Sequence, residues 1–167
     1  MPESIRACKT LSDFYSELEP FVLQLGFDGY AITVFEDERA RRAVAQLNNY
    51  PAAWLKEYTE NNYLSDDPIH KAISKSFLPV IWSDLEKNSC GVDISGHNVL
   101  VRAKKYGLVS GISIKIICSS DFYAVISFFS HQPHYEMVDK YLTFSHEIAS
   151  LADSLACHFI TLSEFKK

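Results

Sequence analysis

Hydrophobic side chains recur at intervals of three and four residues near the start of the chain. This spacing predicts an amphipathic helix from Leu11 to Leu25 that packs one face on a core. Ser12 is the expected N-cap and Gly26 the expected C-cap. Pro20 is expected to kink this helix or to split it in two. The apolar positions are Leu11, Phe14, Leu18, Phe21, Val22 and Leu25.

Runs of β-branched and aromatic residues predict the strands. The last two runs are separated by Ser119-Ser120-Asp121, a turn sequence, so they are expected to form a hairpin. The expected strands are Tyr30–Phe35, Ala43–Leu47, Leu78–Trp82, Ser110–Cys118 and Phe122–Ser130.

The other helices are indicated by their starts and stops. Pro51 suits the first helical position, Asp67 followed by Pro68 suits an N-cap, and Gly107 closes a helix. Residues 87–96 are expected to form a loop. The expected helices run from Pro51 to about Asn61, from Asp67-Pro68 onward, over Val99–Tyr106, and from Tyr135 to about Phe165.

The order of these elements favours an α+β fold. Helices and hairpins are segregated instead of alternating strictly, which argues for an antiparallel sheet with helices on both faces. We therefore expect a three-layer α-β-α sandwich around an antiparallel sheet of about five strands. Residues 1–167 are long enough for a single domain.

Composition and charge argue against two classes of function, nucleic-acid binding by this chain alone and membrane binding. The net charge is −5, so this chain alone is a poor candidate for binding nucleic acid, which depends mainly on Lys and Arg. The sequence has no secretory signal pattern and no apolar run long enough to span a membrane. Cys8, Cys90, Cys118 and Cys157 lack metal-site spacing and are expected to be reduced thiols. These features predict a cytoplasmic protein that does not bind membranes.

The segment between Tyr50 and Trp82 carries the most candidate chemistry. It includes two tryptophans, three tyrosines and the pair Asp66-Asp67. Trp and Tyr offer donors on apolar bodies, and an ionised carboxylate is an acceptor. A few fixed donors, one acceptor and apolar walls are what a site for a small amphipathic molecule needs.

The same segment resembles the autoinducer-binding domain of LuxR-type quorum-sensing regulators. The resemblance covers roughly Leu11 to Phe159. It rests on Asn49-Tyr50-Pro51, Trp54, Tyr58, Tyr63, Asp67-Pro68, Pro79 and Trp82, together with Ala103, residues 107–111 and the strand ending near Ser127.

The resemblance implies that the domain encloses one N-acyl homoserine lactone between the sheet and a helical layer. Trp54 would donate to the lactone carbonyl, and Asp67 would accept from the ligand amide N–H. Tyr50 and Ser127 would donate to the acyl carbonyl. Tyr58 and Trp82 would pack on the head group.

The chain departs from the family pattern at three positions. Ile69 stands where a hydroxyl or small aliphatic residue is common, and Val99 stands where an aromatic lid is common. His70 is unusual. It is either a partly exposed helix residue or, if it faces the pocket, a group that favours an oxygen on the third acyl carbon.

Other interpretations remain open. Trp54 and Tyr58, four residues apart, are also typical of a core-facing helix, and Asp67 is equally suited to capping a helix. His131 and His134 are more typical of surface residues than of a metal site. No nucleophile elbow, metalloprotease or phosphate-loop motif is present, so no enzyme and no cofactor are expected.

The main functional prediction is a sensor domain that binds an acyl lactone. The alternatives are a generic small-molecule or redox sensor of similar fold, and a regulator that acts by heterodimerisation. A homodimer is expected. Residues 1–167 are not expected to include the family's DNA-binding helix-turn-helix domain, so DNA would be bound only through such a further domain.

Overall fold

A computed structural model describes residues 2–36, 42–75, 77–87 and 94–163. The helices are α1 (Glu3–Ala7), α2 (Leu11–Gln24), α3 (Ala52–Glu60), α4 (Pro68–Ile73), α5 (Trp82–Lys87), α6 (Ile94–Lys104) and α7 (His134–Leu162), with a 3-10 turn η1 (Tyr63–Ser65). The strands are β1 (Gly29–Glu36), β2 (Arg42–Asn48), β3 (Val80–Ile81), β4 (Ser110–Ile117) and β5 (Phe122–Ser130).

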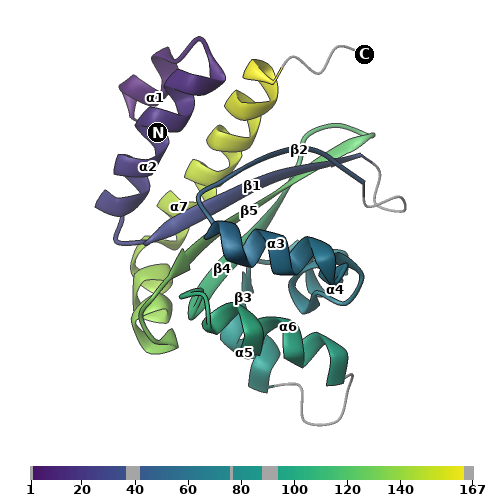
Figure 1. Ribbon diagram of the computed structural model, residues 1–167. Helices are drawn as coiled ribbons and strands as arrows, with labels where there is room; N and C mark the ends of the chain where they lie inside the picture. Colours follow the sequence, from purple (N-terminus) through teal and green to yellow (C-terminus); the bar gives the residue numbers. More distant parts are fainter. Residues whose placement is uncertain (1, 37–41, 76, 88–93, 164–167) are drawn as a thin grey trace.

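The described strands form one five-stranded sheet in the order β2-β1-β5-β4-β3, with every neighbouring pair antiparallel. Helices α2 and α7 cover one face, and α3, α4, α5 and α6 cover the other (Figure 1). The expected α+β class and three-layer α-β-α sandwich are therefore confirmed.

Alternation along the strands divides the interior into two parts. On β1, Tyr30, Ile32 and Val34 join the core beneath α2 and α7. The intervening residues Ala31 and Thr33 face the α3–α6 layer and line a cavity. Because successive strand side chains point to opposite faces, one strand serves both a packed core and a hollow site.

Helix α2 differs from expectation at its start and its middle. Thr10, not Ser12, is the N-cap, and its hydroxyl accepts from the Asp13 N–H at 3.1 Å. The helix continues through Pro20, so a split is wrong. Phe14, Leu18 and Val22 are buried on both sides of the proline, and this packing outweighs the missing hydrogen bond.

The region around Trp82 also differs from the expected strand Leu78–Trp82. Only Val80–Ile81 pairs with β4, and Trp82 begins helix α5 instead of ending a strand. Helix α6 begins at Ile94, so the end of the expected loop is helical, while residues 88–93 of that loop lie outside the described residues. Short apolar runs of this kind do not separate strand from helix by periodicity.

Several turn signals are confirmed. Gly26 and Gly107 follow α2 and α6 with φ of 81° and 86°, the left-handed conformation that ends helices. Asp67 caps α4, and Pro68 is its first residue. Pro51 lies one position earlier than expected, as the N-cap of α3.

Candidate functional site

A cavity of about 310 Å³ lies between the sheet and the α3–α6 layer. All eight site residues expected from the sequence line it, namely Tyr50, Trp54, Tyr58, Asp67, Ile69, Trp82, Val99 and Ser127. They come from distant parts of the chain, and the fold brings every one of them together. The volume falls at the small end of the range of roughly 300–1,000 Å³ found for ligand pockets.

Helix α3 supplies two aromatic side chains from one face. Trp54 and Tyr58 are four residues apart, so they project side by side, with ring centroids 5.5 Å apart and an interplanar angle of 70°. Trp54 is only 4% exposed. Within the described residues its indole N–H donates no hydrogen bond to the protein. That donor is available to a molecule in the cavity.

Asp67 has two structural roles. Its Oδ1 accepts from the Ile69 N–H at 2.8 Å, which caps α4, and its Oδ2 accepts from the Tyr58 hydroxyl at 2.7 Å. The residue is 6% exposed. A carboxylate offers about four lone-pair positions, so these bonds leave acceptor capacity on the cavity side. The cap interpretation and the site interpretation are therefore compatible.

The tyrosines near Asp67 are held neutral. Burial raises the pKa of the Tyr58 hydroxyl well above its usual range, and the charge of Asp67 raises it further. Burial and the Asp67 charge also raise the pKa of Tyr50, while a hydrogen bond with Ser127 acts in the opposite direction. Both phenols remain hydrogen-bond donors at neutral pH.

Trp82 differs from Trp54 because its N–H is already used. Its Nε1 donates to the Ser113 hydroxyl at 2.9 Å, and that oxygen lies 2.7 Å from the Ser127 hydroxyl. A Cβ on Gly111 would come within 2.6 Å of the Trp82 ring. The ring therefore packs directly on the β4 backbone, and only glycine permits this approach.

Ser113 was not identified as a site residue from the sequence. The signal was present, because Ile112, Ile114 and Ile116 alternate with residues of the opposite face of β4. Ser113 lies on that opposite face with Gly111, next to Ser127 in the antiparallel pairing.

The remaining lining is mostly apolar. Ile69 from α4 and Val99, Leu100 and Ala103 from α6 form much of the helical wall. His70 is half-buried and also lines the cavity, with its ring edge-on to Phe35 at 5.0 Å. Four further polar side chains of the lining were not identified from the sequence, namely Thr33, Gln46, Thr59 and Asn62.

Other site types find no support in the part of the chain that the structure describes. No three His, Cys, Asp or Glu side chains come together in a way that could hold a metal ion. None of the described helices combines the length and the apolar character that crossing a membrane requires. Cys8, Cys118 and Cys157 are free thiols, and Cys90 lies outside the described residues.

Comparison with known proteins identifies relatives by sequence and by structure. The Aliivibrio fischeri transcriptional activator LuxR is 26% identical over 125 residues, which are 74% of this chain and 49% of that protein. The chain thus spans about half the length of this relative. Among solved structures, the N-acylhomoserine lactone-dependent LuxR-family factor CepR2 from Burkholderia cenocepacia has a TM-score of 0.77 at 17% identity, covering 96% of this chain and 92% of that chain.

Escherichia coli SdiA has a TM-score of 0.72 at 20% identity, covering 96% of this chain and 65% of that chain. A further SdiA structure is a complex with octanoyl-rac-glycerol. At these identities the solved structures support the fold. The family itself follows from a model described as "Autoinducer binding domain", which matches residues 10–157. The chain therefore belongs to the autoinducer-binding domains of LuxR-type quorum-sensing transcriptional regulators, a family of ligand-binding domains and not of enzymes.

Proposed function

We propose that the cavity binds an N-acyl homoserine lactone. The observation that carries this proposal is the contrast between the two indoles. Trp82 donates to Ser113, whereas the Trp54 N–H has no partner among the described residues and lies in a cavity that also contains the buried Asp67 carboxylate. A donor and an acceptor fixed in one small cavity match a ligand that has both a carbonyl and an amide N–H.

In this proposal the polar side chains bind different polar groups of the ligand. Trp54 donates to the lactone carbonyl, and Asp67 accepts from the amide N–H. Tyr50 and Ser127 donate to the acyl carbonyl. When Ser113 donates to Ser127, which the 2.7 Å separation of the two hydroxyls allows, the Ser127 proton can turn from the Tyr50 oxygen to the ligand carbonyl.

The other site residues act as walls and supports. Tyr58 donates to Asp67 and so holds the carboxylate in place. Trp82 packs on β4 beside the head group, and Ile69 and Val99 line the acyl chain. His70, on the cavity wall, favours a chain with an oxygen on its third carbon, because an imidazole adds a hydrogen-bonding group to a mostly apolar wall.

Ligand binding would act through folding. A molecule that binds the native state alone stabilises it by RT ln(1 + [L]/Kd), about 2.7 kcal/mol at a hundredfold excess over Kd. In a complete regulator the stabilised domain would act as a cytoplasmic homodimer, with DNA bound by a separate helix-turn-helix domain. The chain alone would not bind nucleic acid.

A thermal-shift series tests this function. N-butanoyl, N-hexanoyl, N-octanoyl and N-dodecanoyl homoserine lactones, with and without a 3-oxo group, are added to the protein. The matched control is N-octanoyl homoserine with its lactone hydrolysed, and 1-octanoylglycerol is a separate arm. We expect at least one lactone to raise Tm in a saturable manner and its hydrolysed form to have a much smaller effect. Stabilisation by the acylglycerol alone, or by none of these molecules, would reject the lactone.

A further inference from the structure

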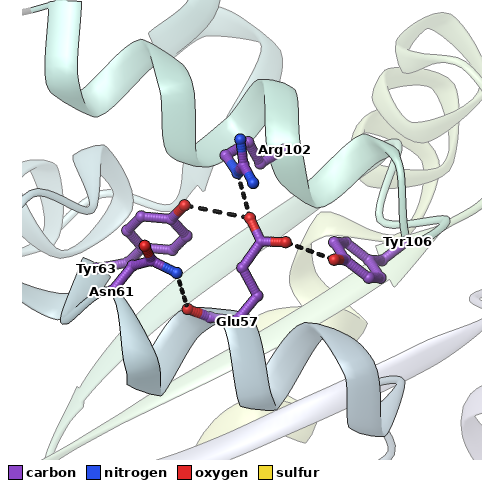
Figure 2. A network of polar contacts seen from close by, with 5 residues as sticks. All are labelled: Glu57, Asn61, Tyr63, Arg102 and Tyr106. Carbon is purple, nitrogen blue, oxygen red and sulfur yellow. Dashed lines mark hydrogen bonds and ion pairs between the residues drawn. The ribbon is translucent and has the colours of Figure 1, made fainter.

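A carboxylate outside the cavity lining joins the two helices that wall the cavity. Glu57 lies on α3 between Trp54 and Tyr58, and its side chain is 14% exposed. Figure 2 shows three side chains converging on it from other elements. Its Oε1 accepts from Arg102 Nε and, at 3.2 Å, from the Tyr63 hydroxyl, and its Oε2 accepts from the Tyr106 hydroxyl.

The partners of Glu57 are also the packing partners of Trp54. The Tyr106 ring lies 5.6 Å from the Trp54 ring at 41°, and the Tyr63 ring lies 6.0 Å from it at 33°. Tyr63 also meets the Tyr58 ring edge-on at 5.9 Å. The carboxylate therefore fixes two of the three tyrosine rings that contact the indole, and the third ring, Tyr58, is bonded to Asp67 instead.

The network also ties α3 to the opposite helical wall. Arg102 lies on α6, next to Ala103 and three residues after Val99, both of which line the cavity. Tyr106 follows the same helix by two residues. Separating α3 from α6 would break the bonds of Glu57 to both residues, and it would also take the Tyr106 ring away from Trp54.

An isolated surface ion pair would have little effect, since exposed pairs contribute little to stability. Glu57 differs from such a pair because three donors converge on one carboxylate, one from η1, one from α6 and one from the turn after α6. Hydrogen bonds from Arg102, then from Tyr106, lower the pKa of Glu57 from 4.5 to about 2. The carboxylate is thus held in its ionised form by groups that have fixed positions.

We propose that Glu57 is a positioning residue that joins α3 to α6 over the cavity through its hydrogen bonds, fixes the Trp54 indole and so slows ligand release. The part about release rests on the proposed function, whereas the fixing of the indole does not. Glu57 does not touch the ligand. It acts through Tyr63, Tyr106 and Arg102 on the residue that does.

The variant Glu57→Gln removes the charge and keeps the side-chain shape. The matched control is Glu60→Gln, three residues later on the same helix, where the carboxylate pairs only weakly with Lys56 at 3.9 Å and is 63% exposed. N-octanoyl homoserine lactone is the probe, and stopped-flow fluorescence gives its dissociation rate. We expect Glu57→Gln to raise this rate by roughly tenfold, the effect of losing charge-assisted hydrogen bonds, and Glu60→Gln to leave it unchanged.

A second measurement needs no ligand. In a Trp82→Phe background, acrylamide quenching reports on Trp54 alone. We expect Glu57→Gln to increase this quenching and Glu60→Gln to leave it unchanged. Equal quenching in the two variants would overturn the proposal. So would equal dissociation rates in a protein that binds the probe.

These outcomes separate the two proposals. Failure of the natural protein to bind any lactone would reject the function, and the quenching result would still decide whether Glu57 positions Trp54. If Glu57→Gln does not fold, Tyr106→Phe takes its place, because it removes one donor and keeps the ring that packs on Trp54. It is expected to change both readouts in the same direction by a smaller factor.

Discussion

At the scale of single residues, the two tryptophans of the cavity differ in whether the indole N–H already donates a hydrogen bond within the protein. The Trp82 N–H is satisfied by Ser113, and the Trp54 N–H has no partner among the described residues. An unmade hydrogen bond on a nearly buried donor is costly. A ligand acceptor removes that cost, which makes Trp54 the more informative residue to change.

Trp54→Phe is expected to weaken lactone binding by roughly 1–2 kcal/mol, because it removes one donor and keeps an aromatic ring. Its effect on the ligand-free protein should be small. Trp82→Phe is the contrasting variant and should lower the Tm of the ligand-free protein, because it leaves Ser113 without its donor. Isothermal titration of both proteins checks the difference. Unchanged affinity in Trp54→Phe would remove this indole from the site.

Asp67→Asn separates the two roles of Asp67. Asn is as good an N-cap as Asp, and with its amide oxygen in the Oδ1 position it can still accept from the Ile69 N–H. Its amide nitrogen then faces the Tyr58 hydroxyl, which can accept a hydrogen bond instead of donating one. Stability without ligand should therefore fall little. Binding should fall more than in Trp54→Phe, because the amide nitrogen can face the ligand N–H as a second donor. Equal stabilisation of the variant and the natural protein by lactone in thermal-shift experiments would reject the ligand role of Asp67.

At the scale of helices and strands, the connection between α3 and α6 has a defined pH dependence. The pKa of Glu57 is lowered from 4.5 to about 2. A carboxyl with a lowered pKa in the folded state adds stability that is complete above its unfolded pKa and lost as the pH falls toward the folded one. The groups facing it do not titrate in this range, because the pKa values of Arg102, Tyr63 and Tyr106 are all raised.

The difference in Tm between the natural protein and Glu57→Gln should therefore be constant from about pH 8 to about pH 5. It should shrink as the pH falls from 4.5 toward 2, the interval between the two pKa values of Glu57. Calorimetry over this series, with Glu60→Gln in parallel, makes the comparison. A difference that declines already between neutral pH and pH 5 would contradict the assignment.

Elements and lining residues were predictable to different degrees. The strands of the sheet followed from periodicity, which is a local signal, whereas the eight site residues were taken from the resemblance to the family. Trp82 in a helix and the start of α6 at Ile94 did not, because short apolar runs are ambiguous. The bonds of Glu57 to Arg102 and Tyr106 join positions 45 and 49 residues apart, and no local pattern specifies such a meeting.

At the scale of the whole molecule, the sheet separates two differently filled halves. Beneath α2 and α7, residues such as Phe14, Leu18 and Ile126 are fully buried in a continuous core. Beneath α3–α6 the aromatic cluster around Trp54 borders a cavity of about 310 Å³. Side chains that line a void lack packing partners on one side. The α3–α6 layer should therefore open locally at lower free energy than the α2–α7 layer.

Hydrogen exchange followed by mass spectrometry checks this asymmetry. In the free protein, amides of α3 and of residues 99–104 in α6 should exchange faster than buried amides of α2. Saturating N-octanoyl homoserine lactone should slow exchange mainly in the α3–α6 layer, because a ligand that fills the void stabilises the elements lining it before it affects global unfolding. The charge network of Glu57 should add to this protection, so Glu57→Gln should reduce it in α3 and α6 and leave α2 unchanged. Equal protection of both layers would indicate that the molecule opens only as a single unit, and the two halves would then not differ in stability.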